Sequence, residues 1–306
     1  MGIDLQALAV GIDAGGSKTE LLAAVPGNPP TQHFAPGVNL QRDGVERTTE
    51  VLSGLLREAL EASDSSGVSR VTIGISGAGR EGEQDLIAEA LTEMLPAISA
   101  ANISVMHDAH LAHEAAFQGK SGIVIVSGTG SIIFARTVDD EFERAGGWGS
   151  RLGDEGAGTA IGWAALRAVA AEMDGGPPTV LREWLKREHG IGSPDALIAR
   201  AYAESQWPVQ HLAPLVIQAA EENDWVATLI LKQQANALAQ QAGWLATRTD
   251  GNVEKKLALV GGLISHSVYY RECLAEALLR YLPAWRLIEP AESPAEAALR
   301  LSATAA

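Results

Sequence analysis

A strand–turn–strand unit that occurs twice constrains the fold of this chain more than any other feature. The apolar run 8–12 ends at Asp13, passes through a glycine-rich turn and returns as a second apolar run, 21–25. Residues 122–126, a turn of glycines and small hydroxyls, and residues 132–135 repeat this order. Short apolar runs bounded by glycine are typical of buried strands. We therefore expect a duplicated β-hairpin, with one copy near the start of the chain and one in its middle.

Helical and extended patterns alternate over the rest of the chain. Apolar spacing predicts helices at 44–63 and 86–95, a helix-rich stretch from about 158 to 245, and a short helix at 294–301. Further strands are expected at 71–75, 103–106 and 257–260. This alternation predicts an α/β fold with some antiparallel pairing. Together with the duplicated hairpin, it favours two similar lobes with a cleft between them.

The charge and composition of the chain exclude several classes of function. Lys and Arg number 23 against 38 Asp and Glu, and this net charge of −15 disfavours binding to nucleic acid or to anionic membranes. The single cysteine, Cys273, excludes an internal disulfide, a four-cysteine zinc site and an iron–sulfur cluster held by one chain. No run approaches the ~20 apolar residues of a membrane span, and the first residues lack the basic start of a signal peptide. We expect a cytoplasmic protein.

The first turn has the composition of a phosphate-binding loop without its full pattern. A P-loop that starts at Gly11 needs lysine at position 17, where this chain has Ser17. An acidic residue in a phosphate cradle repels phosphate unless a cation lies between them, so Asp13 is a candidate to face Mg²⁺, directly or through water. The glycines let backbone N–H groups approach phosphate oxygens. The alternative is a tight hairpin turn in which the Asp13 side chain accepts a local hydrogen bond.

Two other glycine clusters could also contact a nucleotide. The turn 127–131 sets small hydroxyls among glycines and forms a potential nest of N–H donors, or else a plain hairpin turn. Gly261 and Gly262 follow an apolar strand, and paired glycines allow a flat adenine or ribose to lie against the backbone. An ordinary strand-to-helix turn explains them equally well.

Asp108 is the candidate proton acceptor. It follows the strand 103–106, and α/β folds place ligand-facing residues at such strand ends. A carboxylate there could take the proton from a substrate hydroxyl, or it could simply cap the next helix. His107, His110 and His113 nearby invite a metal-site reading. They would fan over roughly 120° of a helix with no cysteine beside them, so ordinary helix positions are favoured.

The segment 146–156 is the densest motif of the chain. Trp148 stands among glycines, which is a poor design for a core but suits stacking on a sugar or a base. Asp154 could accept hydrogen bonds from sugar hydroxyls. The alternative is a loop that caps the helix starting near Ala157, with Asp154 or Glu155 favoured there by the helix dipole.

Taken in order, these motifs resemble the N-acetylglucosamine kinase and BadF/BadG-type ATPase family. The order is G-I-D-A-G-G-S-K-T, H-D-A-H, S-G-T-G-S, G-G-W-G with G-D-E-G, and V-G-G-L. The resemblance implies the actin–hexokinase–heat-shock ATPase fold, with two ribonuclease-H-like lobes and a cleft between them. The lobes would span 1–113 and 114–293, the second with a helical insertion, and a terminal helix at about 294–306 would pack back on the first.

The resemblance also implies a role for each motif in a reaction that uses ATP and Mg²⁺. Asp108 would be the general base toward a sugar hydroxyl, most simply the 6-hydroxyl, and Asp13 would face Mg²⁺. The residues near phosphate or nucleotide would be Gly15, Gly16, Ser17, Lys18, Thr19, Gly128, Thr129, Gly261 and Gly262. Besides Asp108, the residues near the sugar would be Asn39, Ser127, Gly128, Thr129, Gly147, Trp148 and Asp154.

Departures from the family pattern separate its branches. The dehydratase activators use two cysteines per chain and the repressor-type sugar kinases a cysteine-rich zinc motif, and this chain has neither. Leu40 stands where some members carry an aromatic residue, which leaves N-acetylglucosamine, free glucosamine and N-acetylmuramic acid open as substrates. An ATPase that drives a partner protein and a sugar sensor are further alternatives. Having both Asp13 and Asp108 favours an enzyme, and a homodimer is common in the family.

Overall fold

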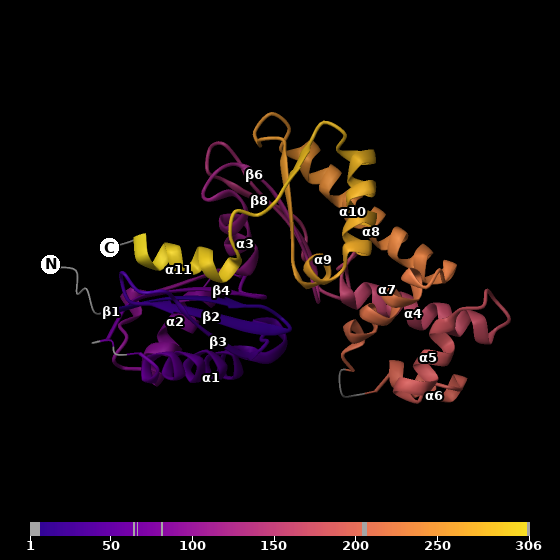
Figure 1. Ribbon diagram of the computed structural model, residues 1–306, viewed down its shortest axis with the longest axis horizontal. Helices are drawn as coiled ribbons and strands as arrows, with labels where there is room; N and C mark the ends of the chain where they lie inside the picture. Colours follow the sequence, from indigo (N-terminus) through magenta and orange to yellow (C-terminus); the bar gives the residue numbers. More distant parts are fainter. Residues whose placement is uncertain (1–6, 64, 66, 81, 204–206, 305–306) are drawn as a thin grey trace. The chain divides into compact units, whose positions relative to one another are not determined.

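The computed structural model describes residues 7–63, 65, 67–80, 82–203 and 207–304. The chain divides into two compact units, Met1–Lys120 with Glu289–Ala306, and Ser121–Ile288. The expected division at 113/114 would cut a helix that continues to Phe117. Figure 1 shows the final helix returning to the sheet of the first unit.

The first unit is a five-stranded mixed sheet in the order β3-β2-β1-β4-β5. β1, β2 and β3 form an antiparallel meander, while β4 and β5 run parallel to β1. The strands are β1 (Ala7–Ala14), β2 (Lys18–Ala24), β3 (Thr31–Pro36), β4 (Gly67–Ile75) and β5 (Ile103–His107). The predicted runs 8–12 and 21–25 of the first hairpin form β1 and β2, except that Val25 follows the end of β2.

Helices cover both faces of this sheet. α1 (Leu40–Glu61) and α2 (Glu83–Met94) pack together, and their apolar side chains, such as Leu52 and Ile87, join the core under β1 and β4. α3 (Asp108–Phe117) and α11 (Pro294–Thr304) form a smaller cluster around Leu111 and Ala298. The hydroxyl of Ser302 donates to the carbonyl of Val10 at 2.7 Å and so ties α11 to β1. A short 3₁₀ turn, Ala100–Asn102, precedes β5.

The second unit repeats the arrangement of the first. Its sheet order is β10-β9-β6-β7-β8, again a three-strand meander beside two strands that run parallel to its first member. The strands are β6 (Gly122–Ser127), β7 (Ser131–Arg136), β8 (Phe142–Gly146), β9 (Lys256–Val260) and β10 (Arg286–Ile288). The duplicated hairpin predicted from the sequence is therefore confirmed.

The helix-rich stretch of the second unit builds its core. The long helix α8 (Trp225–Arg248) buries a row of Ala and Leu side chains and packs on α4, α7 and α10. The remaining helices are α4 (Gly158–Met173), α5 (Val180–His189), α6 (Pro194–Ala201), the 3₁₀ helix Val209–Leu212, α7 (Ala213–Glu221), α9 (Gly262–His266) and α10 (Val268–Tyr281).

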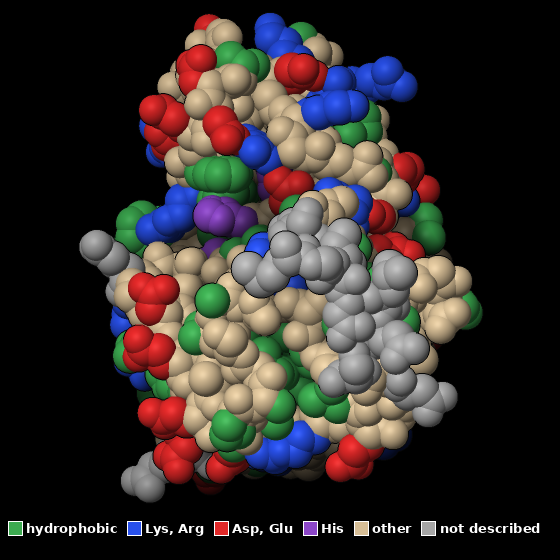
Figure 2. Space-filling model, turned by 90° about the vertical axis from the view of Figure 1, so that its left-hand side faces the viewer, with side chains coloured by type: hydrophobic (Ala, Val, Ile, Leu, Met, Phe, Trp, Pro, Cys, Tyr) green, Lys and Arg blue, Asp and Glu red, His purple; other side chains and the backbone are tan. Residues whose placement is uncertain are grey.

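Charged side chains of both signs lie on the surface of the molecule (Figure 2). Figure 2 shows acidic side chains spread over the visible face with Lys and Arg among them, so the excess negative charge is dispersed there. Among the helices that the structure describes, none is long and apolar enough to cross a bilayer.

Candidate active site

In the first unit, the candidate residues gather where three parallel strands end. β1, β4 and β5 run in the same direction, so their carboxyl ends share one edge of the sheet. Asp13 lies near the end of β1, Ser76 directly follows β4, and Asp108 directly follows β5. The topology therefore brings together two carboxylates that are 95 positions apart in the sequence.

Asp13 is in an unfavourable place for a negative charge. Burial raises the pKa of its carboxyl from 3.8 to about 7, and the charges of Asp108 and Glu20 push it further in the same direction against the weaker effect of Lys18. Glu20 lies opposite Asp13 in the β1–β2 pairing. A cation bound here would relieve this repulsion, and carboxylate oxygens are the ligands that Mg²⁺ takes. The donor set thus fits the magnesium expected from the sequence.

Asp108 is the first residue of α3, but it does not cap that helix. The cap is His107, whose Nδ1 accepts a hydrogen bond from the amide of Ala109 at 3.0 Å. The same Nδ1 lies 2.8 Å from Oδ1 of Asp108, so protonation of the imidazole there would exchange the capping bond for an ion pair. With the cap supplied by its neighbour, the Asp108 carboxylate is available for other chemistry.

Asn39 holds the start of α1 to the segment after β4. Its Oδ1 accepts from the amides of Gln41 and Arg42 at 3.1 and 3.2 Å, which makes it the N-cap of the helix. Its Nδ2 donates to the hydroxyl of Ser76 at 3.1 Å. An amide NH₂ carries two hydrogens, so one N–H remains that Asn39 could offer to a ligand. Asn39 caps only a short first segment of α1, because Gly44 has a non-helical backbone (φ +75°, ψ 174°) and the continuous helix follows it, as the apolar spacing from residue 44 predicts.

The turn between β1 and β2 offers its backbone more than its side chains. The hydroxyl of Thr19 is buried and donates to the carbonyl of Pro36 at 3.0 Å. Lys18 pairs with Glu20 at 2.8 Å and lies over the ring of Phe34. Gly15 closes the turn by donating to the carbonyl of Lys18 at 3.0 Å. The Thr19 side chain is therefore engaged within the sheet, and Ser17 and Lys18 are the exposed residues of the turn, with Gly16 partly exposed.

In the second unit, the turn 127–131 rests on the first residues of α4. Gly158 donates its amide to the carbonyl of Gly128 at 2.8 Å, and Thr159 donates both its amide and its hydroxyl to the carbonyl of Thr129. The hydroxyl of Ser127 is buried and donates to the carbonyl of Gly156 at 2.7 Å. Ser127 therefore acts within the fold, and Gly128 and Thr129 form the presented part of the turn.

Gly261 and Gly262 lie against this same turn. Gly261 has a φ of +107°, and a Cβ on it would come within 2.3 Å of the Ser127 carbonyl oxygen. Only glycine fits there, because the backbone conformation and the close approach each exclude a side chain. The structure thus joins two glycine clusters that are separated by 130 positions in the sequence.

Asp154 points into the turn from the loop before α4. Its Oδ1 accepts from the amide of Ser131 at 3.3 Å, and its backbone is left-handed at a φ of +64°. Burial raises the pKa of its carboxyl, with a further contribution from the charge of Glu155 that the Ser131 bond opposes. Asp154 thus faces the turn and does not cap α4, whose N-cap residue is Ala157.

Hydrogen bonds from three elements fix the loop that carries Asp154. The hydroxyl of Ser131 donates to the carbonyl of Glu155 at 2.8 Å, and the amide of Gly156 donates to the side chain of Gln234 on α8 at 3.0 Å. From α10, the hydroxyl of Tyr270 donates to the carbonyl of Gly156 at 2.7 Å, and burial raises the pKa of that phenol. The sequence did not predict a role for Tyr270, because its hydrogen-bond partner is 114 positions away and no local motif indicates that contact.

Other neighbours of the site also lacked a sequence signal. Arg42 holds Asp43 through two hydrogen bonds and reaches the carbonyl of Gly16 at 3.4 Å, so it places a cation beside the first turn. Ser76 is the partner of Asn39. Only His107 had a signal, its place directly before Asp108. His113 is fully buried and stacks on Phe117, as expected for an ordinary helix position.

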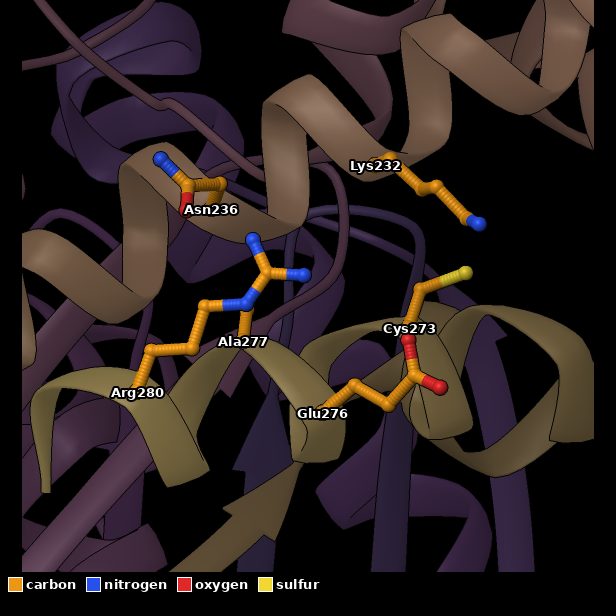
Figure 3. A pocket seen from close by; sticks show the side chains of 6 residues that line it. All are labelled: Lys232, Asn236, Cys273, Glu276, Ala277 and Arg280. Atoms are coloured by element: carbon orange, nitrogen blue, oxygen red, sulfur yellow. The ribbon is translucent and has the colours of Figure 1, made fainter. Parts of the chain in front are cut away.

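Outside the candidate site, the described residues form a small pocket and no cluster of metal-ligating side chains. Within the described parts of the chain, no group of three or more His, Cys, Asp or Glu side chains is placed to hold a metal ion. A small pocket between α8 and α10 (Figure 3) has none of the candidate residues in its lining, which consists of Lys232, Asn236, Cys273, Glu276, Ala277 and Arg280. Burial raises the pKa of the Cys273 thiol, which keeps it protonated and a poor nucleophile.

The fold and these carboxylates define an ATP-using enzyme of the actin–hexokinase ATPase fold. The sequence profile of the BadF/BadG/BcrA/BcrD ATPase family matches residues 10–299, and the chain belongs to that family. This confirms the family, the fold and the use of ATP that the resemblance implied.

Two curated proteins similar to this chain are named as sugar kinases. It is 29% identical over 310 residues to the N-acetyl-D-glucosamine kinase of Dictyostelium discoideum, covering 96% of this chain and 97% of that protein. It is 30% identical over 235 residues to the N-acetylmuramic acid/N-acetylglucosamine kinase of Clostridium acetobutylicum, covering 75% and 76%. The crystal structure of a candidate N-acetylglucosamine kinase from Chromobacterium violaceum matches with a TM-score of 0.77 at 25% identity, covering 97% of this chain and 99% of that one.

Proposed function

We propose that this enzyme is an amino-sugar kinase that transfers the γ-phosphoryl group of ATP to the 6-hydroxyl of N-acetylglucosamine. The observation that carries the proposal is the pair of carboxylates at one sheet edge, Asp13 at the end of β1 and Asp108 at the end of β5. The relative from Dictyostelium, similar over nearly its whole length, supports the choice of sugar.

Asp108 is the group we assign to proton transfer. Its carboxylate accepts the proton of the sugar hydroxyl as the hydroxyl oxygen bonds to the γ-phosphorus and the bond to ADP breaks. His107 caps α3 by accepting from the amide of Ala109, which leaves the Asp108 carboxylate to face the sugar hydroxyl. Phosphoryl transfer depends mainly on positioning and on charge stabilisation, so a single well-placed base suffices beside the phosphate contacts.

Asp13 is the residue we assign to Mg²⁺, directly or through water. Mg²⁺ bound there would neutralise charge on the phosphate oxygens. The raised pKa of Asp13 means that this carboxyl is about half protonated near pH 7 and must lose its proton to face a cation. The backbone of Gly16 and Ser17 in the first unit, and of Gly128 and Thr129 in the second, would contact the phosphates.

The sugar contacts are assigned to Asn39, Gly147, Trp148 and Asp154. Asn39 retains one N–H to donate, and the carboxylate of Asp154 could accept a hydrogen bond from a sugar hydroxyl. Gly261 and Gly262 are assigned to adenosine. N-acetylmuramic acid is a second candidate substrate, because the Clostridium relative is named for both sugars.

A coupled assay of ADP release from Mg²⁺–ATP tests the proposal. The panel is N-acetylglucosamine, N-acetylmuramic acid, glucosamine, N-acetylmannosamine, glucose and no sugar. We expect release that depends on N-acetylglucosamine, with the phosphate located by NMR on oxygen 6. Equal release with and without sugar would point instead to an ATPase that drives a partner, and no release would point to a sensor.

The role of Asp108 is tested by Asp108→Asn. Losing a general base lowers rate by about 10²- to 10⁴-fold, so we expect kcat to fall by that factor with little change in the KM for sugar. The control is Glu89→Gln, which removes an exposed charge from α2 in the same unit. Turnover near the wild-type rate in Asp108→Asn would remove Asp108 from the mechanism.

A further inference from the structure

Trp148 keeps a large exposed surface although a cation covers it. The side chain lies in the loop after β8, and the residue is 63% exposed. The guanidinium carbon of Arg144, on β8, lies 4.5 Å from the centre of the indole ring. A guanidinium at this distance stacks on one face of the ring. The opposite face therefore supplies the surface that a ligand can reach.

The backbone around Trp148 is built to fold the ring back over β8. Gly146, Gly147 and Gly149 all have φ values near +70° to +80°. A Cβ on Gly147 would come within 2.7 Å of Ile132, and its amide donates to the carbonyl of Ser131 at 3.1 Å. The loop backbone on either side of Trp148 is thus defined, and Gly153 of the same loop lies beside the indole, where a Cβ would come within 3.8 Å of its Cδ1.

Arg144 is itself held in place. Its Nη1 donates to the carbonyl of Gly146 at 2.6 Å, and its own carbonyl accepts from Nη2 of Arg248 at 2.5 Å. Arg248 in turn pairs with Glu143 at 2.9 Å. Among the residues that the structure describes, no carboxylate forms an ion pair with the Arg144 guanidinium, which contacts the Gly146 carbonyl and the indole ring.

We propose that Arg144 is a positioning residue for the sugar. It stacks on one face of Trp148, fixes the orientation of the ring and leaves the other face to the carbon–hydrogen face of a pyranose. This inference rests on the proposed sugar-kinase function and on the assignment of Trp148 to the sugar. A ring held before the ligand arrives loses less conformational entropy on binding, so Arg144 strengthens sugar binding without touching the sugar.

The size of the effect follows from the contact. Cation–π pairs at exposed sites and the ordering of one side chain each correspond to a factor of about two to ten in affinity. We expect Arg144→Met to raise the KM for sugar by about three- to tenfold, with kcat and the KM for ATP unchanged. Arg144→Lys keeps the charge but loses the planar stack, so it should restore only part of the affinity.

A double-mutant cycle tests whether Arg144 acts through Trp148. Trp148→Leu removes the ring, and in that background Arg144→Met should have no further effect on the KM for sugar. The matched control is Arg136→Met, since Arg136 lies over the ring of Phe142 in the same sheet at 5.4 Å. The control should leave the KM unchanged.

Three outcomes would overturn the inference while the kinase activity itself stands. The first is an unchanged KM in Arg144→Met, and the second is an additive effect in the double mutant. The third is a loss confined to N-acetylmuramic acid, which would show that Arg144 attracts the sugar carboxylate.

A measurement that needs no enzyme activity tests the Arg144–Trp148 contact separately from the proposed function. Acrylamide quenching of tryptophan fluorescence, with Trp148→Phe to identify the Trp148 signal, reports the stack directly. Arg144→Met should expose Trp148 to more quencher. If no sugar is phosphorylated, the proposed function fails, and unchanged quenching would separately refute the Arg144–Trp148 contact.

Discussion

Replacing Asp13 with asparagine should stabilise the ligand-free protein, although Asp13 is assigned to the reaction. Burial and the charges of Asp108 and Glu20 raise the pKa of the Asp13 carboxyl from 3.8 to about 7. The folded state therefore binds a proton that the unfolded chain releases. Asparagine has a similar shape and no charge to bury, so Asp13→Asn removes the penalty.

The free-energy cost of burying the Asp13 carboxyl increases with pH. Below about pH 4, Asp13 is protonated in both states and its ionisation costs nothing. Between 3.8 and about 7 the unfolded chain is ionised while the folded protein is not, so the free energy of unfolding falls as pH rises. One pH unit in this range corresponds to about 1.4 kcal/mol. The free energy of unfolding of Asp13→Asn relative to wild type should therefore increase by about 2 to 3 kcal/mol between pH 5 and pH 8.

The distribution of aromatic residues allows the measurement to be made on the correct unit. All seven tryptophans and all four tyrosines lie within 148–285, in the second unit, whereas Asp13 lies in the first. Urea unfolding without Mg²⁺ or nucleotide should be followed at pH 5, 6, 7 and 8 by circular dichroism, which sees both units. Tryptophan fluorescence at the same pH values reports the second unit.

The control for this experiment is Glu89→Gln, which removes an exposed carboxylate from α2 in the same unit. The reasoning is refuted if the difference between Asp13→Asn and wild type stays constant from pH 5 to pH 8. It is equally refuted if the wild type gains stability relative to the variant as pH rises.

Three further predictions follow from named contacts. Mg²⁺–ATP should bind about tenfold more weakly at pH 6 than at pH 8, because a proton with a pKa of about 7 occupies Asp13; calorimetry should find a smaller difference in Asp13→Asn. Gly11→Ala should destabilise the first unit by about 1 to 3 kcal/mol, because its Cβ would lie 2.1 Å from the amide nitrogen of Leu299; a circular dichroism melt at wild-type temperature would contradict the packing of α11 on β1. Thr159→Val should cost about 1 kcal/mol by removing the 2.7 Å bond to the carbonyl of Thr129, and the tryptophan-detected urea midpoint measures it.

Local patterns were sufficient for the elements that are buried on both sides. Residues 8–12, 71–75 and 122–126 are runs of aliphatic residues and glycine, with one threonine, as expected for a central strand, and they lie in β1, β4 and β6. Three strands were missed, β3, β8 and β10, and each lies at or next to the edge of its sheet. Their residues are largely exposed, so they show little apolar pattern. They are extended because their backbones pair with an adjacent strand: β3 with β2, β8 with β7 and β10 with β9.

At the candidate site, the sequence determined which residues could do chemistry and the tertiary structure decided which side chains are available for it. Asp13, Asp108 and the glycine turns are visible as local motifs, because glycine and carboxylate have local meaning. Whether a hydroxyl or amide is already bonded depends on partners far along the chain. Thr19 bonds Pro36, Ser127 bonds Gly156 and Asn39 bonds Ser76.

The two readings of Asp108 show the same division. A carboxylate at a strand end can be a helix cap or a base, and the residues around it allow both. The folded chain decides by giving the cap to His107 and by setting Asp108 close enough to Asp13 for their charges to interact. Sequence by itself determined a duplicated α/β fold and its chemical groups, because strand and turn propensities are local. Only the tertiary structure decided the pKa of the carboxyl groups and which hydrogen-bond donors and acceptors are left for a ligand. Burial and charge act through space between residues that are distant in the chain.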